Sequence, residues 1–297
     1  MAKIQELKIG RYPPAVTVNP ETSVIEIIKE LSKFRIRHAV VCDKEGKLKG
    51  LISARDIINL LGGGERYDKA IERYESLYKA IMQEKALDLM YEAPYFYTDD
   101  TLEDVVTIMM ERDIGACPVV DSNLYVGGII SEKHIMALFS DATIYIPVKK
   151  IMSSPIITLP PQATLIEGQK AMIENDIRRL VLKGVKGIKS TLTLIDIVSY
   201  YARDEILGKL EEDLVDEVHK KPLQLIPGRK TVYVSPETDL GKAIKLMREN
   251  KTGFLIVGEG EGIVTERDFL LKIPRIMGVE VFVNEAKKLI VPGLIHF

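Results

Sequence analysis

The sequence has few of the residues that mark catalytic and metal sites. Among its 297 residues are two cysteines and four histidines, and the histidines are isolated from one another (His38, His134, His219 and His296). None of the motifs GxSxG, GxxxxGK and HExxH is present. The glycine run 62–64 follows a predicted helix, which is typical of a helix end and hinge. We therefore expect no enzymatic activity, no metal and no catalytic cofactor.

Long apolar runs are also absent. No segment approaches the roughly 18 apolar residues of a transmembrane helix, and the start at Met1 lacks the apolar core of a signal peptide. The formal net charge of −2 gives no overall attraction for nucleic acid or anionic lipid. We expect a soluble, cytoplasmic protein that binds no membrane, with nucleic-acid binding disfavoured unless a local basic cluster forms.

The two cysteines, Cys42 and Cys117, lie inside apolar, strand-like runs. Neither has CxxC or other metal-ligand spacing around it. Free cysteine is among the residue types most often buried. The pattern predicts two buried free thiols.

The sequence does contain a fourfold internal repeat. An apolar strand, a hydroxyl residue and, three positions later, the start of a helix recur at similar intervals, in segments 50–57, 128–135, 192–197 and 262–269. The residue three positions after the hydroxyl is Asp56, His134, Asp196 or Asp268. The recurrence predicts four structurally equivalent units.

Each unit reads as β-α-β-β-α. Extended segments are expected at 14–18, 94–97, 155–159 and 230–234 because β-branched and aromatic residues gather there. A hydroxyl residue followed three positions later by an acid starts the next helix in three units, at 23–26, 101–104 and 164–167. The fourth unit has Thr238 and Asp239 but Gly241 where the acid is expected, so we predict a less well capped helix there.

The odd and even units differ where the second strand begins. Units one and three carry basic pairs, at 37–38 and 178–179, whereas units two and four carry Gly115 and Gly253. This alternation indicates that an older pair was duplicated, and it predicts two tandem pairs. The expected boundaries are 1–64 for repeat 1, 65–145 for a connecting helix and repeat 2, 146–205 for repeat 3, 206–277 for a connecting helix and repeat 4, and 278–297 for a C-terminal extension. Segments 279–283 and 288–291 of the extension predict a short β-hairpin.

At this point the sequence resembles the family of cystathionine-β-synthase-type (CBS) domains, whose tandem pairs are called Bateman modules. The strand order, the Gly-Ile-Ile-Thr-x-x-Asp-Ile-like ending and the pairing carry the resemblance, from about Pro13 to about Ile273. The four-repeat plan resembles stand-alone archaeal members and the gamma subunit of AMP-activated protein kinase. The implied fold is α/β (α+β), with four CBS repeats in two Bateman modules that form a flat, pseudosymmetric disc.

Elementary chemistry supports a nucleotide at the ending motif. Hydroxyl and backbone N–H groups at a helix N-terminus suit a phosphate, and a carboxylate can accept hydrogen bonds from both hydroxyls of a ribose. The resemblance implies AMP, ADP or ATP as the ligand, bound between paired repeats, with apolar strand edges around the adenine. The implied ligand-binding residues are Ser53, Arg55, Asp56, Thr193, Asp196, Thr265, Arg267, Asp268, Arg37, His38, Arg178, Arg179, Thr17 and Thr158. His134 departs from the pattern and predicts an empty or altered site in the second unit.

Several interpretations stay open. Each motif is also a good N-cap, which needs no ligand. An arginine beside the acid, as at Arg55 and Arg267, is unfavourable near the positive end of a helix dipole unless an anion is present, and so favours ligand binding. The alternatives to a nucleotide sensor that acts in trans on an unidentified effector protein are an S-adenosylmethionine sensor and an interaction scaffold without nucleotide. A homodimer is compatible with each of them.

Overall fold

The computed structural model describes residues 3–7 and 9–289. The chain divides into two compact units. Unit 1 comprises Met1–Pro13, Pro94–Ile156 and Val232–Phe297, and unit 2 comprises Pro14–Ala93 and Ile157–Thr231. Unit 2 therefore holds repeats 1 and 3, and unit 1 holds repeats 2 and 4. Each unit combines one repeat from each half of the chain.

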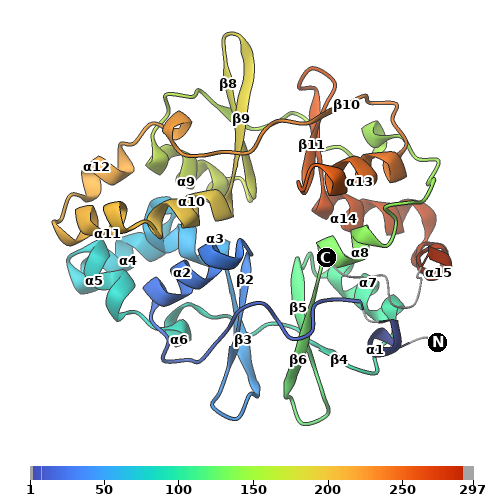
Figure 1. The fold of residues 1–297 in the computed structure, drawn as a ribbon, viewed down its shortest axis with the longest axis horizontal. Coiled ribbons are helices and arrows are strands. Elements are labelled where there is room, and N and C mark those ends of the chain that lie inside the picture. Colours follow the sequence, from blue (N-terminus) through green and yellow to red (C-terminus); the bar gives the residue numbers. More distant parts are fainter. Residues whose placement is uncertain (1–2, 8, 290–297) are drawn as a thin grey trace. The chain divides into compact units, whose positions relative to one another are not determined.

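Each repeat builds one three-stranded mixed sheet (Figure 1). The first strand is a short edge strand parallel to the second, and the second and third form an antiparallel hairpin. The strands are β1 (Thr17–Val18), β2 (His38–Cys42) and β3 (Leu48–Ser53); β4 (Phe96–Tyr97), β5 (Ala116–Val120) and β6 (Val126–Ser131); β7 (Thr158–Leu159), β8 (Arg179–Gly184) and β9 (Gly187–Thr193); and β10 (Tyr233–Val234), β11 (Phe254–Val257) and β12 (Gly262–Thr265). The predicted fold class, with its four repeats, is confirmed.

Two helices belong to every repeat. The first, between the first and second strands, is α2 (Val24–Phe34), α7 (Leu102–Glu111), α9 (Leu165–Glu174) or α13 (Leu240–Glu249). The second follows the third strand and is α3 (Ala54–Ile58), α8 (Glu132–Ala137), α10 (Leu194–Tyr201) or α14 (Glu266–Met277). The expected capping boxes form at α2, α7 and α9, where the acid accepts from the N-cap backbone N–H. Asp239, not Thr238, caps α13, and its carboxylate accepts from the N–H of Gly241 at 2.9 Å.

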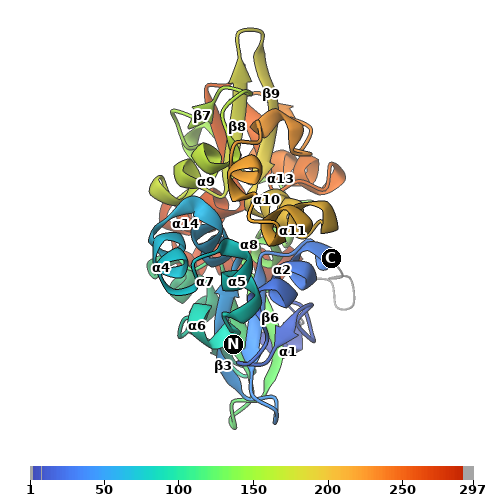
Figure 2. The same ribbon diagram turned by 90° about the vertical axis from the view of Figure 1, so that its left-hand side faces the viewer.

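The connecting stretches are helical, as predicted, but each is broken in two. The first forms α4 (Glu65–Tyr74) and α5 (Leu77–Gln83), with Glu75 between them at φ 63°, and is followed by α6 (Ala86–Leu89). The second forms α11 (Asp204–Glu211) and α12 (Val215–His219). Figure 2 turns α4, α5 and α11 toward the viewer. The glycine run ends a π-helical turn, Asn59–Gly63, in which Gly62 has φ 133°, so the predicted helix end is confirmed.

The chain makes a further strand-like pairing each time it leaves a unit. Just before the chain passes to the other unit, one residue forms an antiparallel β-bridge with the third strand of the unit that the chain is leaving. The four bridges are Arg11↔Ile129, Tyr91↔Leu51, Ser153↔Ile263 and Arg229↔Thr191. This explains the glycine that opens the motif in three repeats. A Cβ on Gly128 would lie 2.3 Å from the Tyr12 ring, and one on Gly50 would lie 2.7 Å from the Tyr91 carbonyl oxygen.

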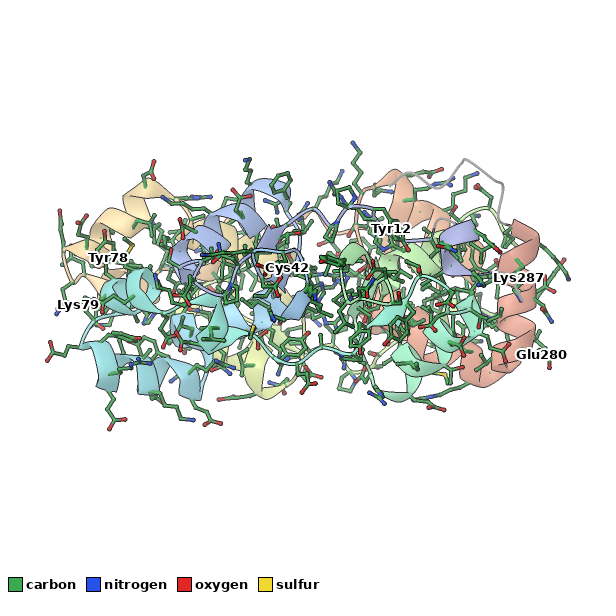
Figure 3. All side chains as sticks on the ribbon, turned by 90° about the horizontal axis from the view of Figure 1, so that it is seen from below. Tyr12, Cys42, Tyr78, Lys79, Glu280 and Lys287 are labelled. Carbon is green, nitrogen blue, oxygen red and sulfur yellow. The ribbon has the colours of Figure 1, made fainter. Side chains whose placement is uncertain are left out.

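The prediction of a β-hairpin in the C-terminal extension is wrong. Residues Val279–Leu289 form the helix α15. The alternating valines favour a strand locally, but Phe282, Val283 and Ala286 recur at helical spacing and bury one face against α14 and α7. Glu280 and Lys287 lie on α15 in Figure 3. Part of the second predicted strand, residues 290–291, lies outside the described residues.

The remaining described elements are short. They are α1 (Ile4–Leu7) and the 3₁₀ turns Val148–Lys150 and Leu223–Leu225. Cys42 and Cys117 are buried and unpaired, as predicted, and burial raises the pKa of each thiol, to about 11 and about 12. Within the described part of the chain, no helix combines the length and apolar character needed to cross a membrane.

Candidate functional site

The ending motif places a hydroxyl and a side-chain acceptor together at the start of the second helix in every repeat. In repeat 1 the Oδ2 of Asp56 accepts from the backbone N–H of Ser53 at 2.9 Å and from its hydroxyl at 2.7 Å. Thr193 and Asp196 repeat the arrangement at 3.0 and 2.6 Å, and Thr265 and Asp268 at 2.9 and 2.7 Å. The capping role predicted for the motif is therefore filled in these three repeats.

Strand register brings the basic residues of repeats 1 and 3 to the motif. His38, the first residue of β2, lies opposite Ser53, and Arg179, the first of β8, lies opposite Thr193. The carbonyl oxygens of the preceding residues, Arg37 and Arg178, accept from the first helical N–H of α3 and α10 at 2.7 and 3.2 Å. In repeats 2 and 4 the equivalent register partners of the hydroxyl are Ala116 and Phe254. The hairpins thus gather the four basic residues in unit 2.

The pKa of His38 shows that arginines of two repeats lie close to the same imidazole ring. The pKa of His38 lies well below its ordinary 6.5, first because the ring is desolvated and then because of the charges on Arg37 and Arg178. Arg37 belongs to repeat 1 and Arg178 to repeat 3, so the two repeats act on one imidazole. Desolvation disfavours any charge at this place, whereas the charges of the two arginines by themselves favour an anion there.

Two arginines that the sequence analysis missed lie on Asp196. Arg35, the residue that ends α2 with φ 51°, donates from Nη2 to Oδ1, and Arg229 approaches the same oxygen with Nε at 3.2 Å. The Asp196 side chain is 2% exposed. Residues 113, 176 and 251 share the left-handed conformation in the other repeats. Sequence reasoning could not find Arg35 because its contact depends on how repeats 1 and 3 pack.

Arg55 and Arg267 each meet a carboxylate of the other repeat in their unit. Arg55 pairs with Asp176 and donates to the Ile173 carbonyl at 2.8 Å, and Arg267 pairs with Asp113. The anion expected beside each arginine is thus supplied, at least in part, by the protein itself. A role for Arg55 and Arg267 in ligand binding stays a prediction.

Repeat 2 uses His134 in place of the acid. Its Nδ1 accepts from the backbone N–H of Ser131 at 3.0 Å, so the imidazole caps the helix as a carboxylate does elsewhere. This bond needs a deprotonated Nδ1. Desolvation and then Lys133 lower the pKa of His134 to about 4, with a further contribution from Arg11 and an opposing effect of Glu266.

Stability is therefore expected to depend on pH through His134. An unfolded chain protonates this residue near pH 6.5 and the folded protein only near pH 4, so the unfolded state binds more protons between these values. The contribution of this group to the free energy of unfolding is complete above about pH 6.5 and is lost as the pH falls toward 4. His134→Asn should show a smaller loss between pH 7 and 4.5 in urea unfolding. An unchanged pH dependence contradicts this assignment.

The two remaining sequence candidates, both threonines, lie farther along the strands. Thr17 and Thr158 lie on the edge strands β1 and β7, opposite Val40 and Val181. Two lysines on the third strands have partners away from the motif: Lys49 pairs with Asp43 at 3.0 Å, and Lys189 donates to the side chain of Gln224 at 2.6 Å. The structure therefore brings His38 and Arg179 to the motif hydroxyls but not Thr17 or Thr158.

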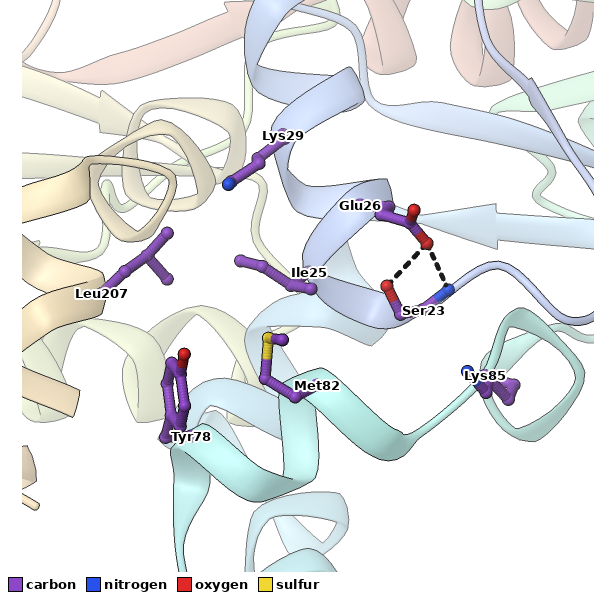
Figure 4. Close-up of a pocket in the computed structure, with 8 residues that line it drawn as sticks. All are labelled: Ser23, Ile25, Glu26, Lys29, Tyr78, Met82, Lys85 and Leu207. Atoms are coloured by element: carbon purple, nitrogen blue, oxygen red, sulfur yellow. Dashed lines mark hydrogen bonds between the residues drawn. The ribbon is translucent and has the colours of Figure 1, made fainter. Parts of the chain in front are cut away.

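Unit 2 also has a pocket at the beginning of α2 (Figure 4). Its volume is about 440 Å³. Figure 4 shows Met82 and Tyr78 on α5 facing Leu207 and Ile25. The lining residues are Ser23, Ile25, Glu26, Lys29, Tyr78, Met82, Lys85 and Leu207. None of the sequence-predicted site residues lines this pocket, so it is separate from the motif.

Comparisons with known proteins agree with this architecture. The CBS-domain family profile matches residues 9–63, 84–141, 148–203 and 215–275. A 33.4 kDa protein from the ribosomal RNA operon of Thermofilum pendens is 38% identical, over 99% of this chain and 100% of its own length. The crystal structure of MJ1225 from Methanocaldococcus jannaschii, described as a proposed archaeal homologue of γ-AMPK, has a TM-score of 0.83 and 22% identity, covering 91% of this chain and 99% of that chain. A conserved Pyrococcus horikoshii protein has a TM-score of 0.56 and 20% identity, covering 92% and 99%.

Proposed function

This chain belongs to the CBS-domain family, and from that premise we propose that it is a non-catalytic regulatory protein that binds adenine nucleotides and acts in trans on an effector protein. The observation that carries the proposal is the gathering of basic side chains from repeats 1 and 3 in unit 2. Arg37 and His38 begin one strand and Arg178 and Arg179 the other, and the two strands start beside their helix N-termini. We call these four residues the basic set.

The basic set fits phosphates better than any uncharged ligand. Arg37 and Arg178 both lie close enough to His38 to lower its pKa, so their positive charges act at the same place and favour a negatively charged ligand there. Guanidinium groups bind phosphate through pairs of charge-assisted hydrogen bonds. A ligand phosphate in this field also favours the protonated form of His38, which adds a further donor.

The remaining parts of a nucleotide have partners of suitable chemistry. The motif carboxylate suits the ribose hydroxyls, and the motif hydroxyl can assist a phosphate at the helix N-terminus. Adenine is the base that the family resemblance implies. AMP, ADP and ATP differ in negative charge, so a basic set of fixed size distinguishes them, which is what an energy sensor requires. MJ1225, which shares the fold, is itself described as a proposed γ-AMPK homologue.

S-adenosylmethionine is the less favoured adenosyl ligand. It offers a ribose diol but carries a sulfonium cation and no phosphate, so it brings no negative phosphate charge to the basic set. An interaction scaffold requires only the capping roles of the motifs and gives no reason for concentrating arginines at the hairpins of one unit.

Replacing one member of the basic set tests the proposal. Arg178→Gln should weaken ATP binding by roughly ten- to a hundredfold, because a hydrogen bond to a charged group contributes about 1.5–3 kcal/mol. AMP should lose less than ATP. The matched control is Arg73→Gln, which removes an exposed arginine of the same unit that lies over Tyr74.

Fluorescence-monitored thermal unfolding with increasing AMP, ADP, ATP or S-adenosylmethionine measures these affinities, because a ligand of the folded state raises the melting temperature with concentration. Arg73→Gln should behave as wild type. Equal affinities of the Arg178→Gln and wild-type proteins for ATP contradict the role of the basic set. Stabilisation by S-adenosylmethionine alone supports the other adenosyl ligand.

A further inference from the structure

The three motif carboxylates differ in how many hydrogen bonds they already accept. A carboxylate offers two oxygens with about four lone-pair sites. In Asp56, Asp196 and Asp268, Oδ2 accepts from both the backbone N–H and the hydroxyl of the N-cap residue. The three acids therefore differ only at Oδ1, the oxygen that is left for a ligand.

The Oδ1 of Asp196 is filled from within unit 2. Arg35 donates to it from the end of α2, and Arg229 approaches it with Nε at 3.2 Å from the segment that bridges β9. With the two bonds at Oδ2, the carboxylate accepts three hydrogen bonds, and the charges of Arg35 and Arg229 both lie beside Oδ1. The side chain is 2% exposed, which leaves little access for a ligand hydroxyl.

The Oδ1 of Asp268 is filled in a different way. Lys272, one turn farther along α14, donates from Nζ at 2.7 Å, and Ser153 donates from its hydroxyl at 2.7 Å. Lys272 also donates to the Ile151 carbonyl oxygen at 2.6 Å, which holds the ammonium group in place. The Asp268 side chain is 8% exposed. The Asp268 carboxylate therefore accepts four hydrogen bonds, two at each oxygen.

Asp56 differs from both. Its Oδ1 accepts no hydrogen bond from residues 3–7 or 9–289, and the residue is only partly buried. The cation beside it in sequence, Arg55, is turned toward Asp176 and the Ile173 carbonyl. Two lone-pair sites on one oxygen thus remain for the two hydroxyls of a ribose. Asp56 also lies at the start of α3, directly after the β2–β3 hairpin in which His38 of the basic set lies opposite Ser53.

We infer that side chains of the protein itself take the place of a ligand at two of the three acids: Arg35 and Arg229 at Asp196, and Lys272 and Ser153 at Asp268. Recognition of the ribose diol in this chain then rests on Asp56 alone. The inference rests on the proposed function and narrows it: one of the three acid-bearing motifs reads ribose, and the other two are ion-paired helix caps that tie segments of their own unit together.

The ratio of affinities for ATP and 2′,3′-dideoxy-ATP isolates the ribose contact from all other contacts. Isothermal titration calorimetry of the wild type should give one ribose-dependent site per chain, with ATP bound roughly ten- to a hundredfold more tightly than the dideoxy analogue. Asp56→Asn should bring this ratio close to one. Asparagine keeps a carbonyl oxygen that can accept from the N-cap N–H, so the helix start is retained.

Asp196→Asn and Asp268→Asn are the matched controls, and each should keep the wild-type ratio even where the stability of the fold falls. The inference is wrong if either control loses the ratio, if Asp56→Asn keeps it, or if the wild type binds two or more equivalents of ATP in a ribose-dependent manner. The last criterion needs no variant to fold. Failure of the wild type to bind any nucleotide contradicts the proposed function and this inference with it, whereas binding that depends on another acid contradicts the inference alone.

Discussion

Replacing Gly241 with alanine is expected to lower the free energy of unfolding by about 3 kcal/mol, the upper part of the range for overpacked sites. A Cβ at this position would lie 1.8 Å from the carbonyl oxygen of Ala142 and 2.8 Å from its carbonyl carbon. Both obstacles are backbone atoms, which cannot rotate away as a side chain does.

The segment that carries Ala142 is also held in place. The carboxylate of Asp239 accepts from the N–H of Tyr145 at 2.6 Å and from that of Ile144, and Pro147 bridges Asp239. The sequence has no acid at position 241, and from this we predicted a less well capped helix. Packing explains the glycine, because any side chain at this position would collide with the backbone of Ala142. Only glycine lets the 142–147 segment close over the start of α13.

Gly208→Ala provides the matched control for Gly241→Ala. Gly208 lies inside α11, and a Cβ there would meet no atom within 4 Å. Alanine should raise the free energy of unfolding by about 0.5–1 kcal/mol, because glycine is the poorer helix former. Urea unfolding followed by circular dichroism measures both. Shifts of the same sign in the two variants contradict the account of Gly241.

Replacing Phe282 with alanine is expected to lower the free energy of unfolding by about 3–5 kcal/mol, the usual range when a buried phenylalanine side chain is removed and a cavity is left. Phe282 is fully buried, and its ring centroid lies 4.7 Å from that of Phe139 and 5.7 Å from that of Phe269. The three rings join α15 and α14 to the segment after α8. Phe282→Ala should therefore loosen the packing of α15 against the rest of unit 1.

Val281→Ala, in the same helix, is the control for this second substitution, because Val281 is 48% exposed and should change stability by less than about 0.5 kcal/mol. Thermal unfolding gives the loss of stability, and hydrogen exchange of the α15 amides shows whether the helix detaches first. Equal effects of the two substitutions would mean that α15 does not pack against the rest of unit 1 through Phe282.

Local signals predicted most of the repeat. The hydroxyl and acid of each capping box are three residues apart in sequence, and their hydrogen bonds form within one helical turn. The pairing of Ser53 with His38 likewise follows from a short hairpin. The sequence shows basic pairs at the start of two second strands, and the family resemblance implied their role in ligand binding. The structure adds that repeats 1 and 3 share a unit.

Long-range packing decided what the sequence did not reveal. The contact of Arg35 with Asp196 joins residues from different repeats, and no local pattern marks it. The same holds for Arg55 with Asp176, where a carboxylate from another repeat takes the place expected for a ligand anion. The valines of 279–283 favour a strand locally and led to the wrong prediction of a hairpin. Burial of Phe282 against α14 outweighs this local preference.

We propose that this chain binds an adenine nucleotide through the basic set. Titration of the wild-type protein with ATP in a calorimeter, at neutral pH and at two salt concentrations, tests it most directly. We predict saturable binding that weakens as the salt concentration rises, because the contacts are charge-assisted. The absence of saturable heat with AMP, ADP and ATP at millimolar concentrations would contradict the claim and leave the interaction scaffold as the better description.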